Sequence, residues 1–152
     1  MHAKLGDVFP AGLREDFRKR NIVAGSVFKI FATNTDPPKY KIIVLVAVNE
    51  EVALVGYLFV NTDPSWHCID TDELRNLQLF LTHDTRDYLE HDSYLDCSSL
   101  MSHSLSDLDN AFATDGSALL GNLSESDLEI VIEKVTGAKT ISNKQKKLFG
   151  LI

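Results

Sequence analysis

The sequence has few cysteines and no long hydrophobic run. Its two cysteines, Cys68 and Cys97, lie far apart and form no CxxC pair, so neither a disulfide framework nor a zinc site is expected; we predict buried free thiols. No segment approaches the roughly 20 consecutive apolar residues of a membrane helix, so we predict no membrane contact. A formal net charge of −7 argues against nonspecific nucleic-acid binding by the whole surface, but it does not exclude a local basic cleft.

What the chain does contain is an ordinary globular composition, 44% hydrophobic and 24% charged. Its 152 residues are enough to bury one core, so residues 1–152 are predicted to form a single α+β domain. The first seven residues carry neither a cationic start nor an apolar signal core, and we therefore expect a cytoplasmic protein.

Three strands are predicted in the first half of the chain. Residues 26–32 are apolar on most of both faces, residues 40–48 form a continuous β-branched run, and residues 52–60 follow a short turn. They predict an antiparallel meander, with Gly56 at a bulge or bend. Residues 77–81 and 93–97 alternate like two further strands, which extends the predicted barrel over residues 25–97.

Helices are predicted at both ends of the chain. Residues 11–19 form a short amphipathic helix within an N-terminal extension, residues 1–24. Residues 121–150 hold two C-terminal helices. The first begins at Ser124, which precedes Asp127 as in a capping box, and ends at Gly137. The second is capped by Ser142 and stopped by Gly150.

The order and spacing of several short segments between about residues 25 and 135 resemble the PemK/MazF-type toxins. The segments are Gly25-Ser26-Val27-Phe28, the run 40–48, Leu58-Phe59-Val60-Asn61-Thr62, Asp92-Ser93-Tyr94-Leu95-Asp96-Cys97 and Gly121-Asn122-Leu123-Ser124. The resemblance implies a small antiparallel SH3-like β-barrel that forms a homodimer. It also implies the toxin of a type II toxin–antitoxin system, which pairs with an antitoxin protein and cleaves single-stranded RNA as an endoribonuclease without metal or cofactor.

Metal-free cleavage uses the ribose 2′-hydroxyl as nucleophile, so the protein must supply a base, an acid and a donor or cation for the phosphorane charge. In the resemblance, Thr62 matches the family's threonine at the end of the third strand. The family's Arg-Pro pair is absent, and Lys41 is the nearest cation, which neutralises a phosphate but lacks the planar fork of arginine. The catalytic residues expected are therefore Lys41 and Thr62. The expected RNA-binding residues are Lys39, Tyr40, Trp66 and His67.

Other interpretations stay open. Thr62 suits a turn, Lys39 and Lys41 can keep a strand end soluble, and Trp66 with His67 can close the barrel floor. The histidines and aspartates of residues 83–96 have metal-ligand types but no recurrent spacing, so no metal site is expected. Ser93 lacks the strand-turn-helix elbow of a nucleophile. The alternative function is a catalytically inactive barrel of the same architecture that binds a protein or a nucleic acid.

Overall fold

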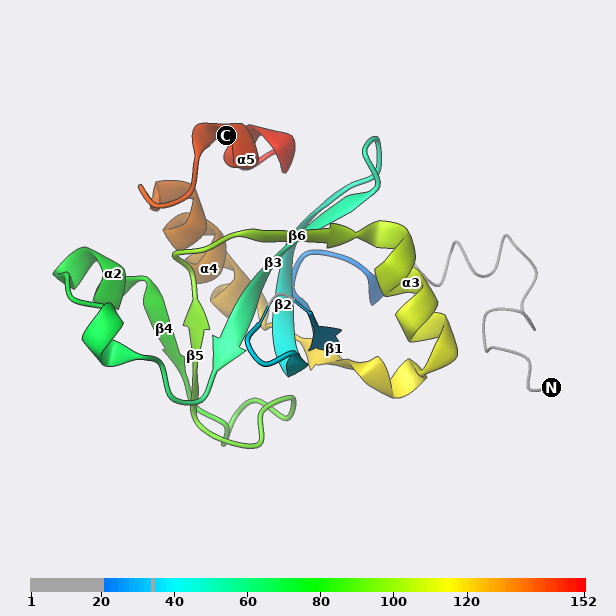
Figure 1. The fold of residues 1–152 in the computed structure, drawn as a ribbon, viewed down its shortest axis with the longest axis horizontal. Helices are drawn as coiled ribbons and strands as arrows, with labels where there is room; N and C mark the ends of the chain where they lie inside the picture. The colour runs from blue at the N-terminus through cyan, green and yellow to red at the C-terminus, as the bar shows by residue number, and fades with distance from the viewer. Residues whose placement is uncertain (1–20, 34) are drawn as a thin grey trace.

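The computed structural model describes residues 21–33 and 35–152, so the helix predicted over residues 11–19 lies outside the described residues. Strands β1 (Ser26–Ala32), β2 (Lys39–Asn49) and β3 (Leu54–Asn61) form the predicted antiparallel meander in the middle of one sheet (Figure 1). Their β-branched and aromatic residues favour the extended backbone, and the turn at residues 50–53 joins the two longest strands.

The sheet of the described residues has seven strands in the order β4-β5-β3-β2-β1-β7, with β6 also paired to β3. Two strands pair with the same edge of β3. Strand β6 (Met101–Ser104) pairs with the first half of β3, and β5 (Ser93–Asp96) pairs with its last residues. Strand β4 (Gln78–Leu81) continues outward from β5, and β7 (Leu119–Asn122) pairs with β1. The sheet curls into a half-barrel (Figure 1).

Each face of the sheet carries its own core, because side chains alternate along the strands. On one face Val44 and Leu58 pack in a cluster with Val131 and Val135 of helix α4 (Glu125–Gly137). The other face lies against helix α3 (Leu105–Thr114). Its cluster includes Phe28, Ile43, Leu45, Val55, Tyr57, Leu108 and Phe112. The two helices lie on different sides of the strands (Figure 1).

A bulge lies next to the glycine that was expected to mark one. The register between β2 and β3 shifts between Leu45 and Ala47, opposite Tyr57 and Gly56. A Cβ atom at Gly56 would lie 3.2 Å from the ring of Phe149 and 3.3 Å from Leu100. Glycine therefore allows the C-terminal segment to pack closely on the bulged strand.

The two C-terminal helices start where the sequence predicts. The Ser124 hydroxyl accepts from the backbone N–H of Asp127 at the start of α4, and the Ser142 hydroxyl accepts from that of Gln145 at the start of α5 (Asn143–Leu148). Gly150 has a φ of 68°, as expected of a residue that stops a helix.

Other elements differ from the prediction. Residues 98–106, for which no strand or helix was predicted, contain β6 and begin α3, and β7 with the short helix η3 (Gly116–Ala118) was also missed. The five-residue helix α2 (Asp72–Asn76) is capped by Thr71, whose hydroxyl accepts from the backbone N–H of Leu74. Of the two free cysteines, Cys97 is buried as predicted but Cys68, in the short helix η2 (Trp66–Cys68), is exposed. No helix within residues 21–33 and 35–152 is long and apolar enough to cross a membrane.

Candidate functional site

The start of β2 and the end of β3 lie together at one end of the half-barrel. Ile43 is paired with Phe59, and Ile30 of β1 is paired with Lys41. Alternation places Lys39, Lys41, Phe59 and Asn61 on one face of these strands, and Tyr40 on the other. Four of the residues that the sequence singled out, namely Lys39, Tyr40, Lys41 and Thr62, line two pockets at this end of the sheet, whereas Trp66 and His67 line neither.

The first pocket, which we call the Thr62 pocket, has a volume of about 220 Å³. It brings Thr62 and Lys41, the expected catalytic residues, together with Tyr40. It also contains residues that sequence reasoning did not assign to this site. The lining residues are Lys29, Tyr40, Lys41, Ile42, Val60, Thr62, Leu89, Glu90, His91 and Ser93. The wall of one small cavity therefore includes residues with a hydroxyl, a carboxylate, an imidazole and, at Lys29, an ammonium group, together with part of Lys41.

The ammonium group of Lys41 is engaged on the opposite side from the face that carries Tyr40. Its Nζ donates a 2.7 Å hydrogen bond to Oδ1 of Asn61 and lies 5.7 Å from the centre of the Phe59 ring. Burial lowers the pKa of Lys41, and the positive charge of Lys39 lowers it further. In this arrangement Lys41 borders the Thr62 pocket while its charge is directed toward the second pocket.

The second pocket, which we call the Asp96 pocket, has a volume of about 480 Å³. It is lined by Lys39, Asn61, Asp63, Pro64, Ser65, Cys68, Ile69, Leu74, Gln78, Asp96 and Ser98. Oδ1 of Asp96 accepts from Gln78 Nε2 at 2.8 Å, from the Ser98 backbone N–H at 3.0 Å and from the Ser98 hydroxyl at 2.5 Å. These bonds fix the carboxylate at the pocket wall.

Aromatic side chains flank both pockets. Tyr94, cross-strand from Asn61, has its ring centre 5.0 Å from that of Trp66 and 5.1 Å from that of Phe80, which is 49% exposed. At the Thr62 pocket, Tyr40 is 66% exposed, lies edge-on to Phe31 and has Lys29 Nζ 5.9 Å from its ring centre. His67, also predicted to contact RNA, is exposed on η2 next to Trp66.

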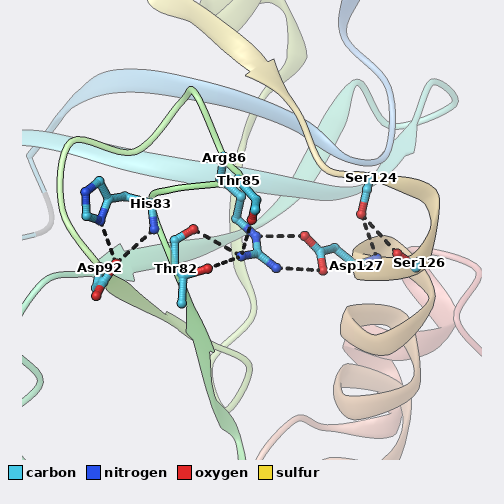
Figure 2. Close-up of polar contacts among 8 residues, drawn as sticks. All are labelled: Thr82, His83, Thr85, Arg86, Asp92, Ser124, Ser126 and Asp127. Atoms are coloured by element: carbon cyan, nitrogen blue, oxygen red, sulfur yellow. Dashed lines mark hydrogen bonds and ion pairs between the residues drawn. The ribbon is translucent and has the colours of Figure 1, made fainter.

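The loop that supplies Glu90 and His91 to the Thr62 pocket is held in place by two sets of polar contacts (Figure 2). At its base, Asp92 accepts from the His83 backbone N–H at 2.9 Å and contacts His83 Nδ1 at 2.6 Å. Further along, the Arg86 guanidinium donates to both carboxylate oxygens of Asp127, at 2.9 and 3.0 Å, and to the backbone oxygen of Thr82 at 3.0 Å. We call the contacts among Arg86, Asp127 and Thr82 the Arg86 clamp.

The Arg86 clamp is largely buried and borders a cavity of about 620 Å³ at the start of α4. The hydrogen bond to Asp127 raises the pKa of Arg86. Tyr88 lines the same cavity; burial raises the pKa of Tyr88, and its hydroxyl has no hydrogen-bond partner within the described chain. Because the guanidinium already has protein acceptors, we interpret this region as a structural support for the loop.

The structure also places Ser93, His91 and Asp96 and the candidate metal ligands of residues 83–96. The Ser93 hydroxyl donates to the backbone oxygen of His91 at 2.8 Å and lines the Thr62 pocket, whereas Asp96 lines the other pocket, so these three side chains form no triad. No group of three or more potential metal ligands is found in the part of the chain that the structure describes. Local patterns could not have revealed that Lys29 and His91 line the same pocket, because β1 and the loop are distant in sequence.

Neither the family models nor the curated proteins with which the sequence was compared match this chain.

Proposed function

We propose that this protein is a metal-independent endoribonuclease that cleaves single-stranded RNA at the end of the half-barrel. The observation that carries the proposal is the Thr62 pocket, where Thr62 and Lys41 lie beside His91 and Glu90. These residue types match what RNA cleavage through the 2′-hydroxyl requires. A hydroxyl and a cation can stabilise a phosphorane, and an imidazole and a carboxylate can move protons.

The proposed reaction is an internal transesterification. The ribose 2′-oxygen attacks the adjacent phosphorus and loses its proton to a base, for which Glu90 and His91 are the candidates in the pocket. The bond from phosphorus to the 5′-oxygen breaks, and that oxygen receives a proton from an acid. The products are a 2′,3′-cyclic phosphate and a free 5′-hydroxyl. Thr62 and Lys29 then serve as donors to the non-bridging phosphate oxygens.

The surroundings of the pocket support binding of a single strand. Exposed aromatic rings beside cations are typical of surfaces that stack bases and neutralise phosphates. Here Tyr40 lies beside Lys29 at the Thr62 pocket. Trp66 lies on the same face of the sheet as Lys39, which lines the Asp96 pocket. The acidic balance of the whole chain confines such binding to this end of the molecule.

The curled antiparallel sheet supports a further part of the proposal, namely that the fold is an SH3-like barrel of the PemK/MazF type. On this proposal the protein is a cytoplasmic toxin that forms a homodimer and is neutralised by an antitoxin protein. Light scattering after size exclusion tests the dimer, and expression in a bacterial host tests toxicity. A monomer that is harmless on expression would contradict this part.

A second candidate function is favoured by the position of the Lys41 ammonium. Because Lys41 donates to Asn61 and lies over Phe59, its charge is not directed at Thr62. A barrel that binds single-stranded RNA without cleaving it needs no such alignment. This candidate is the inactive nucleic-acid-binding module that the missing Arg-Pro pair had suggested.

The test of cleavage is incubation of the purified protein with a long RNA in the presence of a chelator. We expect cleavage that leaves 5′-hydroxyl ends and a loss of roughly 100-fold in rate for both Thr62→Ala and His91→Ala. The matched controls are Thr114→Ala and Lys144→Ala, which change exposed residues of α3 and α5 away from the pocket. Full activity of the two pocket variants, or a requirement for a divalent metal, would contradict the proposal.

Binding separates the two candidates. If the parent protein binds a single-stranded RNA but does not cut it, and Lys41→Ala weakens that binding, the inactive module is the correct function. If the parent protein neither cuts nor binds RNA, both candidates are wrong.

A further inference from the structure

We propose that the Asp96 pocket binds one guanine base of an RNA strand that crosses the end of β2 and β3. This inference rests on the RNA-binding part of the proposed function and adds to it a subsite with a base preference. It does not depend on cleavage, because the Asp96 pocket contains none of the residues assigned to the reaction.

The two pockets are adjacent through consecutive residues of the chain. Asn61 lines the Asp96 pocket and Thr62 lines the Thr62 pocket. The 2.7 Å contact from Lys41 Nζ to Asn61 Oδ1 joins the residues that border the two cavities. A strand whose phosphate lies at Thr62 can therefore place a neighbouring nucleotide on the Asp96 side without leaving the surface.

The carboxylate of Asp96 is held so that one oxygen remains for a ligand. The hydrogen bonds recorded for this group within residues 21–33 and 35–152 all fall on Oδ1, from Gln78 and Ser98. Oδ2 is therefore the acceptor that the pocket presents. A carboxylate fixed by three donors keeps its orientation when a base arrives, so little ordering is required on binding.

Asn61 supplies a hydrogen-bond donor to the same pocket. Because Oδ1 of Asn61 accepts from Lys41, its amide presents the NH₂ group as a donor on the other side. The pocket thus combines a fixed acceptor with a fixed donor. The Watson–Crick edge of guanine has adjacent N1–H and N2–H donors beside the O6 acceptor, and it matches Asp96 together with Asn61. Adenine and cytosine offer one amino group next to an unprotonated ring nitrogen, which a carboxylate repels.

The remaining walls suit a nucleotide. A volume of about 480 Å³ falls in the range of sites that enclose small ligands. Pro64, Ile69 and Leu74 provide apolar surface for the faces of a base, and Lys39 provides a cation for its phosphate. A cationic ligand would compete with Lys39 and would leave the aromatic neighbours Trp66 and Tyr94 without a role.

The experiment measures binding of short RNAs that cannot be cut. The probes are fluorescent hexauridylates with 2′-O-methyl sugars, in which one central base is guanine, adenine or cytosine. We expect the guanine probe to bind the parent protein roughly 10-fold more tightly than the others, as hydrogen bonds from Asp96 Oδ2 and the Asn61 amide to one base edge provide. Equal binding of all probes would overturn the inference.

The decisive variant is Asp96→Asn, which keeps an oxygen for Gln78 and Ser98 and replaces the other oxygen with a donor. It should lose the guanine preference and still bind the uridine parts of the probe. Asp84→Asn removes one exposed carboxylate from the distant loop and should keep the preference. If Asp96→Asn also keeps the preference, the pocket does not read the base.

An independent readout uses Cys68, an exposed thiol that lines the Asp96 pocket. Guanosine monophosphate should slow alkylation of Cys68 by a neutral reagent, and uridine monophosphate should slow it less. Cleavage of long RNA without any base preference, together with no protection of Cys68, would overturn this inference alone. Absence of binding to every probe would overturn it together with the RNA-binding function.

Discussion

The Arg86 clamp and the end of the sheet around Lys41 both gather charged side chains, but they differ in how those charges are compensated. In the clamp, the guanidinium meets both oxygens of Asp127 and a backbone carbonyl. At the sheet end, no ion pair is recorded for Lys29, Lys39 or Lys41 within residues 21–33 and 35–152. The first region is internally satisfied, whereas the second has charge available to a ligand.

On the proposed function, the difference separates the region that stabilises the fold from the region that binds RNA. Removing half of a buried pair leaves a charge without compensation, so variants of the clamp should act on stability. Lysines without a carboxylate partner cost the folded protein little when removed. Variants at the sheet end should therefore act on binding and leave stability almost unchanged.

The largest effect is expected for Asp127→Asn, which leaves the Arg86 guanidinium without its ion pair at a site where both side chains are mostly buried. We expect a loss of roughly 2–4 kcal/mol in the free energy of unfolding. Urea denaturation measures it, with Asp84→Asn as the control for an exposed carboxylate. The double variant Arg86→Leu with Asp127→Leu should recover part of the loss. A loss in the free energy of unfolding below 0.5 kcal/mol, about the scatter of surface substitutions, would show that the clamp does not stabilise the fold.

A smaller effect is expected for Ser124→Ala at the start of α4. The substitution removes the hydroxyl that accepts from the Asp127 backbone N–H at 3.1 Å, and loss of such a cap costs about 1 kcal/mol. Ser126→Ala is the matched control, because Ser126 contacts Ser124 but does not cap the helix. Equal effects of the two substitutions in thermal unfolding would assign the stability of this region to the ion pair alone.

At the sheet end, Lys41→Met should change stability by no more than about 0.5 kcal/mol and weaken RNA binding. Loss of one phosphate contact should reduce the slope of log affinity against log salt by roughly 0.7 for a single strand. Lys139→Met is the control at an exposed site. An unchanged salt slope would mean that Lys41 does not face the RNA.

The stability difference between the parent protein and Lys41→Met should also depend on pH, in a direction set by the pKa of Lys41. The pKa of Lys41 is lowered in the folded protein, so the folded state holds fewer protons than the unfolded state between that lowered pKa and the ordinary value of 10.5. The parent protein should therefore gain stability relative to Lys41→Met as the pH rises through this window. A loss of stability relative to Lys41→Met as the pH rises through this window would contradict the burial of this ammonium group.

The division between the two regions was only partly predictable from the sequence. The meander of β1 to β3 and the caps of α4 and α5 are encoded by neighbouring residues, so alternation and capping signals were sufficient. The strands β6 and β7 contain only four residues each, and they are stabilised by the strands beside which they lie rather than by their own propensity.

The candidate site, too, was only partly predictable from the sequence. Thr62 and Lys41 were named through the resemblance to a known family, but the pocket that they line also contains His91, which lies on the loop that Arg86 joins to Asp127 of α4. The pairing of Arg86 with Asp127 and the closeness of Asn61 to Asp96 depend on how the sheet curls. Such contacts join residues that are distant in the sequence, and a single sequence carries no local signal for them.

The smallest effect is expected where a charged contact remains in solvent, at His83 and Asp92, whose side chains are 52% and 50% exposed. Hydrogen bonds from His83 lower the pKa of Asp92, so this carboxylate stabilises the fold above its ordinary pKa of 3.8, and the contribution disappears as the pH falls through the lowered pKa. The difference in urea midpoint between the parent protein and Asp92→Asn should therefore be small at pH 6 and should decrease further as the pH falls below 3.8. A difference as large as that of Asp127→Asn would make the base of the loop, rather than the Arg86 clamp, the contact that positions His91.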